Sequence, residues 1–289
     1  RRLPRYRFVQ RAVRRFMPGE TMEDAFREAE ALQAMGTAGL VTELGENVET
    51  LMQARGVVDE YLQLAEGVGG RGLDLELSIK LTHLGLDLGL HRAVDHLEEI
   101  AKEAPGIVWV DMESSDYVDA TLEAYRATRE RVENVGLCIQ AYLHRTEADY
   151  EALLPLQPHL RLVKGAYLEP PDVAIARKSE VDEAYRRLAI RMLRDRKAGR
   201  MGRPGIATHD GRLVREVERA AQELELDAKD WEVEMLYGIA TSEQARLRRS
   251  GTPLRVLISY GEHWFPWYMR RLAERPANVG FVLRQMLRG

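Results

Sequence analysis

Leu160-Arg161-Leu162-Val163-Lys164-Gly165-Ala166-Tyr167 is the stretch around which the rest of the sequence is interpreted. Its first four residues alternate apolar and basic side chains as a buried strand allows. Two small residues then let other groups approach the backbone, between a Lys and a Tyr. Because parallel α/β folds build their sites where strands end, two cations and a phenol there suggest a site. A strand whose long side chains reach solvent is the alternative.

Strand-like and helix-like segments alternate on both sides of this stretch. Short apolar runs typical of buried parallel strands occur at 38–44, 73–81, 107–112, 136–143, 160–166, 204–209, 231–236 and 254–259. Helical patterns lie at 47–68, 84–103, 115–131, 146–156, 172–198, 211–225, 240–249 and 264–274. Such βα units with right-handed crossovers predict an α/β protein with a (βα)₈ TIM-type barrel. A doubly wound open sheet is less favoured, because no Gly-x-Gly-x-x-Gly follows a strand; the glycines at 67, 69, 70 and 72 are interpreted as a loop.

The first 36 residues precede this alternation. Residues 1–20 resemble a helix that ends in Met17-Pro18-Gly19-Glu20. Thr21 is expected to cap a second helix, with Asp24 as its capping-box partner, and Gly36 to end it. We therefore expect an N-terminal helical segment at 1–36 and a catalytic barrel domain at 37–289.

Composition excludes several classes of protein. A net charge of −4, with 30% charged residues of both signs, does not favour a nucleic-acid-binding protein. The single cysteine, Cys138, cannot form a disulfide framework, and it suits a reducing cytoplasm. No apolar stretch approaches the roughly 20 residues that span a bilayer. A cytoplasmic protein is expected, and peripheral membrane contact is left open.

The residues that follow the predicted strands are polar. Three cations, Lys80, Arg270 and Arg271, are expected at one mouth of the barrel and suggest a small anionic ligand, most simply a carboxylate. Glu46 or Glu274 could orient Arg270 through an ion pair.

Two other kinds of chemistry are considered. Legitimate metal ligands follow the strands at His83, Asp111, Glu113 and His209. Lys80 and Arg161 in the same mouth would oppose a divalent cation, so no metal is expected. Lys80 or Lys164 could form a Schiff base, and an aldolase-type or lyase-type lysine-imine enzyme acting on a small carboxylate substrate stays open as an alternative.

Five sequence blocks together resemble proline dehydrogenases, most closely the bacterial single-function type. The blocks are Asp111-Met112-Glu113, Gln140-Ala141-Tyr142-Leu143, Val163-Lys164-Gly165-Ala166-Tyr167, Ala207-Thr208-His209 and Tyr268-x-Arg270-Arg271-Leu272-x-Glu274. The resemblance implies a distorted (βα)₈ barrel with extra N-terminal helices that holds FAD without a covalent bond. It also implies oxidation of L-proline to Δ1-pyrroline-5-carboxylate by hydride transfer to FAD N5, with electrons then passed to a quinone. That reaction is the first step of proline degradation to glutamate.

The resemblance further implies roles for individual residues. Lys80, Arg270 and Arg271 would clamp the substrate carboxylate, and Glu46 would pair with the first arginine when the site closes. Asp111 and Arg161 would be the catalytic pair, with Asp111 near Lys80 and Arg161 beside flavin N5. Flavin contacts are implied for Met112, Gln140, Arg161, Lys164, Gly165, Ala166, Thr208 and His209. Walls of the proline pocket are implied for Leu236, Tyr260 and Tyr268; some relatives have a Tyr where this chain has Leu257, so Tyr260 is expected to build that wall.

Overall fold

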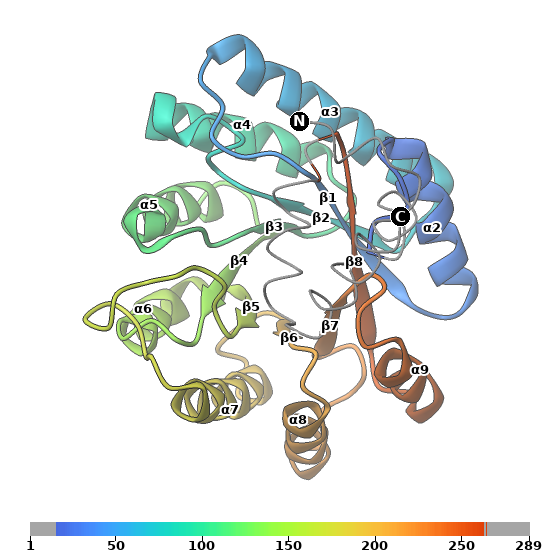
Figure 1. The fold of residues 1–289 in the computed structure, drawn as a ribbon, viewed down its shortest axis with the longest axis vertical. Helices are drawn as coiled ribbons and strands as arrows, with labels where there is room; N and C mark the ends of the chain where they lie inside the picture. Colours follow the sequence, from blue (N-terminus) through green and yellow to red (C-terminus); the bar gives the residue numbers. More distant parts are fainter. Residues whose placement is uncertain (1–15, 263, 265–289) are drawn as a thin grey trace, which may run out of the picture.

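A closed barrel of eight parallel strands dominates the computed structural model, which describes residues 16–262 and residue 264 (Figure 1). The strands follow one another around the barrel in chain order, and β1 closes the ring by pairing with β8. The strands are β1 (Ala38–Glu43), β2 (Leu75–Ile79), β3 (Val108–Val110), β4 (Val135–Gln140), β5 (His159–Val163), β6 (Pro204–Ala207), β7 (Glu232–Leu236) and β8 (Leu254–Tyr260). The predicted TIM-type barrel is confirmed.

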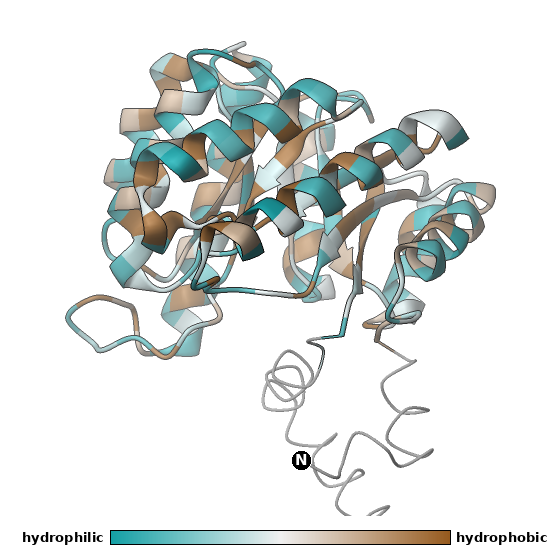
Figure 2. Cartoon of the chain, turned by 90° about the horizontal axis from the view of Figure 1, so that it is seen from above, coloured by the Kyte–Doolittle hydropathy of each residue, from teal (hydrophilic) through white to brown (hydrophobic). Residues whose placement is uncertain are grey.

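Helices surround this barrel and cover its outer surface (Figure 1). They are α2 (Met22–Ala34), α3 (Leu51–Arg71), α4 (Leu90–Glu103), α5 (Val118–Arg129), α6 (Thr146–Leu153), α7 (Lys178–Lys197), α8 (Gly211–Glu223) and α9 (Thr241–Ser250). Short 3₁₀ helices occur at Leu86–Leu88, Ser115–Tyr117 and Leu154–Leu156. Figure 2 shows hydrophilic and hydrophobic residues alternating along the helices, as one buried face per helix requires. No helix within the described residues is long and apolar enough to cross a membrane.

The described part of the predicted N-terminal segment is α2. Thr21 caps it as predicted: Asp24 N–H donates to Thr21 Oγ1 at 3.2 Å, and Asp24 Oδ2 accepts from Thr21 N–H at 3.3 Å. Residues 16–21 form turns and bends rather than helix, and residues 1–15 lie outside the described part of the chain. Helix α2 buries Phe26 and Leu32 in the same apolar cluster as the barrel strands, so it is packed onto the barrel.

Two segment predictions were wrong. The residues around Gly67 belong to α3 rather than to a loop, and Gly72 ends that helix in a left-handed conformation with φ 61°. Gly67 suits this place because a Cβ there would lie 2.3 Å from the ring of Phe26. Helix α7 begins at Lys178 rather than near 172, after a loop that contains Pro170 and Pro171. Residues 173–175 pair instead with the loop after β4: His144 N–H donates to Val173 O at 3.0 Å, and Ile175 N–H donates to Tyr142 O at 2.8 Å. The predicted last helix, 264–274, lies outside the described residues except for Trp264.

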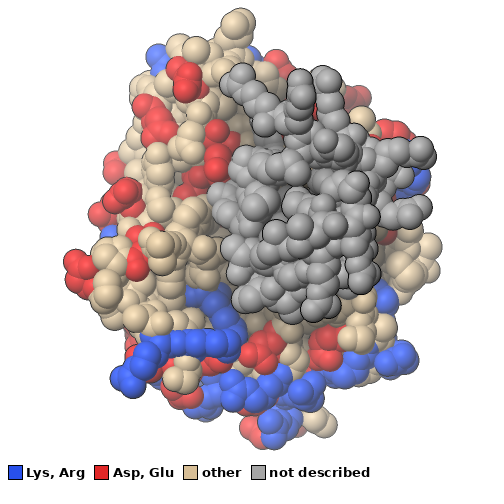
Figure 3. All heavy atoms as spheres, viewed as in Figure 1, with Lys and Arg blue, Asp and Glu red and all other residues tan. Residues whose placement is uncertain are grey.

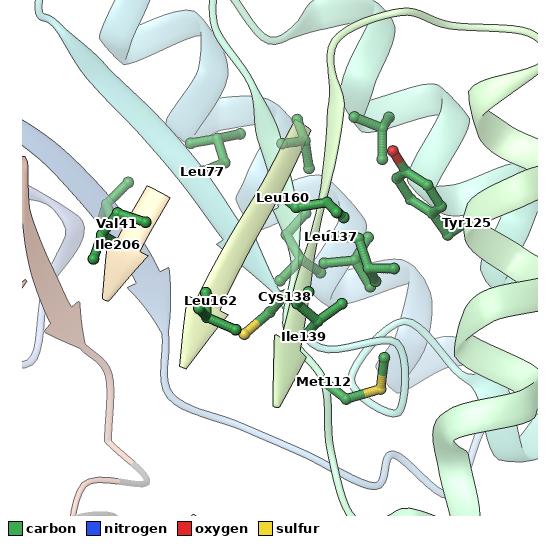
Figure 4. Close-up of a cluster of buried hydrophobic side chains, with 14 of the residues drawn as sticks. Val41, Leu77, Met112, Tyr125, Leu137, Cys138, Ile139, Leu160, Leu162 and Ile206 are labelled. Carbon is green, nitrogen blue, oxygen red and sulfur yellow. The ribbon is translucent and has the colours of Figure 1, made fainter. Parts of the chain in front are cut away.

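An apolar layer lies between the strands and the helices. Figure 4 shows Leu137 and Ile139 of β4 beside Leu160 and Leu162 of β5, with Tyr125 of α5 to their upper right. All of these residues are buried. Because side chains alternate along a strand, the neighbours of Leu160 and Leu162 point to the other face. That rule directs Arg161 into the barrel.

The inside of the barrel is charged. Arg203 Nη2 donates to Glu76 Oε1 at 2.6 Å, and Arg255 Nε donates to Glu232 Oε1 at 3.0 Å. Trp109 Nε1 also donates to Glu76, at 2.7 Å. Burial works against ionisation of Glu76, but Arg255 and Arg203 outweigh it and hold the pKa of Glu76 below its ordinary value. These ion pairs lie below the carboxyl end of the barrel and tie strands together that are far apart in the sequence.

Glu76→Ala is expected to destabilise the fold strongly. It removes the shared carboxylate and leaves Arg203, Arg255 and the Trp109 N–H without it, and an uncompensated buried charge typically costs about 3–5 kcal/mol. Urea unfolding followed by circular dichroism measures the loss. The control is Glu151→Ala, which removes an exposed partner of Arg191 on the outer surface and should change little. Equal unfolding midpoints for the two variants would contradict a structural role for the inner network.

Candidate active site

A cavity of about 410 Å³ opens at the carboxyl ends of the strands. This volume falls within the range of roughly 300–1,000 Å³ that is usual for small-molecule and cofactor sites. Many of the predicted site residues line it together: Lys80, Asp111, Met112, Gln140, Arg161, Lys164, Gly165, Ala166, Thr208, His209 and Leu236. With Thr42 and Glu43 of β1 and Leu257 and Ser259 of β8, which also line the cavity, every strand of the barrel contributes a residue from the strand or from just after it.

Arg161 is the buried cation of this cavity. The residue is 3% exposed, and its guanidinium donates to Asp111 Oδ1, to Ser78 Oγ at 2.8 Å and to Glu234 Oε2 at 3.3 Å. Its charge also lies over the ring of Trp109, 5.3 Å from the centroid. Burial opposes the charged form, but Asp111 and Glu234 outweigh it and raise the pKa of Arg161 above its ordinary value. Arg161 is thus a fixed positive charge that faces the cavity.

Gln140 presents a hydrogen-bond acceptor that no described residue satisfies. Its amide nitrogen donates to the backbone oxygens of Met112 and Glu113, at 3.0 and 3.1 Å. Its Oε1 is buried, and within residues 16–262 and 264 it has no hydrogen-bond partner. A buried acceptor in a cavity lining is costly unless a ligand donates to it.

Gly165 lets the chain pass close to Tyr142. Its φ is +123°, and a Cβ there would lie 2.2 Å from the Tyr142 ring. The Tyr142 hydroxyl donates to Tyr167 O at 3.2 Å, and Tyr142 N–H donates to Lys164 O at 2.9 Å. This segment therefore needs glycine, because any side chain would displace the wall of the cavity that residues 164–167 form.

Lys164 is held by two carboxylates at the rim. Its Nζ lies 2.5 Å from Asp182 Oδ1 on α7 and 3.2 Å from Asp210 Oδ2 at the start of α8. Lys178 pairs with the other oxygen of Asp182 at 2.6 Å. Figure 3 shows Lys and Arg side chains gathered at this edge of the molecule, where α7 and α8 lie. Lys164 is thus part of a rim network of ion pairs.

Lys80 and Glu46 form a second ion pair at the mouth, with Nζ 2.6 Å from Oε2. The loop behind them is fixed by Glu113, which accepts from Thr82 Oγ1 at 2.7 Å and from Thr82 N–H at 3.2 Å. Burial raises the pKa of Glu113. The predicted pairing of Glu46 with Arg270 remains a prediction, because Arg270 lies outside the described residues, as do Arg271 and Tyr268.

His209 and Leu236 are joined through the backbone. Leu236 N–H donates to His209 Nε2 at 3.0 Å, which orients the imidazole beside the cavity. Thr208 is buried next to it, and its Oγ1 accepts from Asp210 N–H at 3.2 Å. Thr208 and His209, the two predicted flavin contacts that follow β6, are therefore held in place by hydrogen bonds.

Tyr260 does not face the cavity. Its side chain points outwards from β8, and its hydroxyl donates to Glu60 Oε1 of α3 at 3.0 Å. Leu257 and Ser259, from the same strand, line the cavity. Residues two apart on a strand share a face, so Tyr260 belongs to the opposite one. The structure thus places Leu257, rather than Tyr260, at the wall that Tyr260 was expected to build.

Sequence reasoning missed three residues of the site. Glu234 and Ser78 hold Arg161, and Glu43 lies in the cavity lining. Burial, together with the charge of Glu60, raises the pKa of Glu43 to about 7. The available signal was the alternation Glu232-Val233-Glu234-Met235, since acids at every second position of a buried strand must point into the barrel.

No group of three or more His, Cys, Asp or Glu side chains is arranged to hold a metal ion within the part of the chain that the structure describes. Cys138 lines the cavity and is buried, and burial raises the pKa of its thiol to about 11. A thiol in that condition is a poor nucleophile.

Comparisons with known proteins agree on one family. The family model described as proline dehydrogenase matches residues 25–284. "Proline dehydrogenase 1" of Bacillus subtilis subsp. natto is 36% identical over 280 residues, which cover 96% of this chain and 91% of the relative. "Proline dehydrogenase" of Deinococcus radiodurans is 37% identical over 284 residues, which cover 95% of this chain and 90% of the relative. The chain belongs to the proline dehydrogenase family.

A solved structure shows the same fold. Proline utilization A from Bdellovibrio bacteriovorus, inactivated by N-propargylglycine, superposes with a TM-score of 0.84 at 23% identity. The match covers 91% of this chain and 32% of the other, so this chain corresponds to about a third of that longer protein.

Members of the proline dehydrogenase family depend on a flavin, and the cavity fits such a group. The buried Oε1 of Gln140 can accept from a ring N–H, the small residues Gly165 and Ala166 in the lining allow a flat molecule to approach the backbone, and Arg161 supplies a positive charge. Gln140 lies on β4, and Arg161 and Gly165 lie on or just after the neighbouring β5. The fit therefore depends on the pairing of these two strands.

Gly165→Ala is expected to lower the flavin content of the purified protein severalfold. The added methyl group meets the Tyr142 ring and must adopt a backbone conformation that costs about 1–3 kcal/mol. Absorbance at the flavin bands relative to protein measures the content. The matched control is Gly199→Ala, where φ is also positive, at +69°, but no atom lies within 4 Å of the new Cβ. Normal flavin content in Gly165→Ala would show that residues 164–167 do not contact the flavin ring.

Proposed function

We propose that this chain oxidises L-proline to Δ1-pyrroline-5-carboxylate with FAD as its flavin and passes the electrons to a quinone. Proline oxidation, the first step of proline catabolism, is supported by the family match and by the relatives from Bacillus and Deinococcus. The choice of FAD, the quinone acceptor and contact with the membrane that holds the quinone rest on the sequence resemblance.

The observation that carries this proposal is the position of Arg161. A buried guanidinium braced by Asp111, Ser78 and Glu234 is directed at a cavity rather than at solvent. Fixed positive charge is most useful where negative charge develops during a reaction, because it needs no reorganisation at that moment. FAD, when bound, supplies the hydride acceptor. Arg161 would favour the negative charge that this acceptor gains.

Substrate binding is assigned to the cations of the mouth. Lys80 lines the cavity, and its ammonium lies at the mouth in an ion pair with Glu46. We assign the carboxylate of proline to Lys80 together with Arg270 and Arg271. Clamping the carboxylate orients the reacting C–H bond, and fixed orientation is a large part of the rate that a site can supply. Leu236 and Leu257 give the apolar walls that a pyrrolidine ring needs.

Asp111 is assigned to Arg161 rather than to Lys80. Its Oδ1 accepts from the guanidinium and also from Ser78 Oγ at 3.1 Å. The carboxylate therefore fixes the direction of the guanidinium fork. Asp111 acts through Arg161, and in this proposal it is not a nucleophile.

The lysine-imine alternative is less well supported by the geometry. Imine formation needs a neutral amine in apolar surroundings. Lys80 is paired with Glu46, and Lys164 is paired with Asp182 and Asp210. Both lysine nitrogens are therefore held by carboxylates in polar surroundings, which is not the apolar setting that imine formation needs.

A direct experiment separates the two chemistries. Protein purified with added FAD should be yellow, proline should bleach the flavin absorption, and the mixture should reduce a dye acceptor. A colourless protein that is trapped covalently by borohydride with a carboxylate substrate would overturn the proposal in favour of the imine enzyme.

Lys80→Met is expected to raise the proline KM while FAD stays bound. Loss of one charge-assisted contact costs about 1.5–3 kcal/mol, or roughly 10- to 150-fold in KM. Steady-state dye reduction over a range of proline concentrations measures the change, and flavin absorbance confirms cofactor binding. Lys102→Met, which removes an exposed lysine of α4, serves as the control and should leave KM unchanged. A normal KM in Lys80→Met would remove Lys80 from the clamp.

Arg270→Ala and Arg271→Ala should have the same signature. Each removes a guanidinium that the proposal places on the substrate carboxylate, so the proline KM rises by roughly the same factor with FAD retained. The same dye assay and flavin absorbance report both variants. An unchanged KM in both would mean that the carboxylate is held elsewhere.

A further inference from the structure

Glu234 is the inner partner of Arg161. It lies on β7 within the cavity lining, is 3% exposed, and accepts from Arg161 Nη1 at 3.3 Å through Oε2. Its other oxygen, Oε1, is buried and has no hydrogen-bond partner among the described residues. Gly205 on β6 provides the space for Oε1, since a Cβ there would lie 2.0 Å from it. An ionised carboxylate with one bare buried oxygen is poorly stabilised.

The charges around Arg161 do not balance if every acid is ionised. Arg161 contributes one positive charge, whereas Asp111 and Glu234 contribute one negative charge each. The trio then carries a net negative charge, which would oppose reduction of a flavin beside it. With a proton on Glu234, the trio is neutral. The protonation state of Glu234 therefore determines the net charge that these three residues present to a ligand in the cavity.

The surroundings of Glu234 support a proton near neutral pH. Burial raises its pKa to about 7, although Arg161 opposes the shift. The charged and titratable groups that face the barrel interior are Glu76, Asp111, Arg161, Arg203, Glu232 and Arg255, and Glu43, Lys80, Lys164 and His209 line the same cavity. Of these, Glu232 and Glu76 favour the neutral form of Glu234, and Arg255 favours the ionised form.

We propose that Glu234 is a positioning residue that holds Arg161 from inside the barrel and, by gaining or losing one proton, sets how much of the positive charge of Arg161 reaches the bound flavin. This inference rests on the proposed function. When proline delivers two electrons, negative charge builds up beside Arg161, and an ionised Glu234 takes a proton from solvent to become a neutral carboxyl. The proton comes from the buffer, and no other reactant is needed.

The test compares the wild type with Glu234→Gln and Glu232→Gln. The amide introduced by Glu234→Gln copies the neutral carboxyl in shape and can still accept from Arg161. Glu232 is the matched control, because it lies two residues earlier on the same face of β7 and pairs with Arg203 and Arg255 rather than with Arg161. The flavin reduction potential is measured on FAD-loaded protein from about pH 6 to about pH 8.5.

The two variants should differ clearly. At about pH 6 the wild type and Glu234→Gln should have equal potentials. At about pH 8.5 the flavin of Glu234→Gln should be easier to reduce, by about tenfold in the equilibrium constant if the coupling is one pKa unit. Glu232→Gln should keep the pH-dependent change of the wild type but show it at a lower pH, because this variant removes one of the charges that favour the neutral form of Glu234. Wild-type protein should also take up an extra fraction of a proton on reduction near pH 8, and Glu234→Gln should not.

Stability gives a readout that does not depend on activity. The folded state holds the proton of Glu234 more tightly than the unfolded chain, so the wild type loses stability as pH rises from about 4.5 to about 7. The melting temperature of Glu234→Gln should therefore rise relative to that of the wild type over this window and then run parallel to it. A purely structural role would instead give the same difference at every pH.

The outcomes separate this inference from the proposed function. If the wild type binds FAD and oxidises proline but its potential changes with pH as that of Glu234→Gln does, the inference fails alone. If the wild type binds no flavin or leaves proline unchanged, the proposed function fails first. Should Glu234→Gln not fold, proton uptake by the wild type on reduction still decides, and its absence near pH 8 overturns the inference.

Discussion

The rest of the structure depends on the burial of one guanidinium. Removing a charge from water costs several kcal/mol unless partners replace the lost solvation, so Arg161 can lie inside the barrel only because Asp111, Ser78 and Glu234 surround it. These partners come from β2, β7 and the end of β3, and Arg161 itself comes from β5. A closed barrel brings all four to one place, whereas an open sheet would spread them along a row. The fold and the site are in this sense a single arrangement.

Buried ion pairs also occupy the barrel interior below Arg161. Below Arg161, the ion pairs of Glu76 with Arg203 and of Glu232 with Arg255 fill a space that apolar side chains fill in many barrels of this type. Acids and bases are mixed at this depth, where Glu76 and Glu232 pair with Arg203 and Arg255. The apolar core lies outside the strands, under the helices, where Leu160 and Leu162 pack. Stability therefore comes mostly from the outer layer, and the inner layer fixes the position of charged groups.

The sequence predicted the rim well and the interior poorly, for a physical reason. Residues at the ends of parallel strands meet at one face whatever their exact side-chain directions, so counting βα units was enough to bring Lys80, Gln140 and His209 together. The interior depends on which of two strand faces points inwards, and a shift of one residue reverses it. Tyr260 shows the difference, because it was assigned to the cavity but points outwards. Arg255 lies inside the barrel, so the odd-numbered residues of β8 point inwards and the even-numbered Tyr260 points outwards. Glu234 lies inside the predicted strand 231–236 rather than at its end, and the sequence analysis considered only the residues at strand ends as site residues.

The two carboxylates that hold Arg161 are not equivalent. The side chain of Asp111 is 26% exposed at the cavity, whereas that of Glu234 is 3% exposed. The exposed partner fixes the direction of the guanidinium through a shared contact with Ser78, and it can exchange contacts with solvent or ligand. The buried partner, Glu234, cannot be solvated. When the charge in the cavity changes, Glu234 therefore responds by gaining or losing a proton. A site that must hold a cation still and also accept two electrons benefits from this division, because one acid supplies geometry and the other supplies adjustable charge.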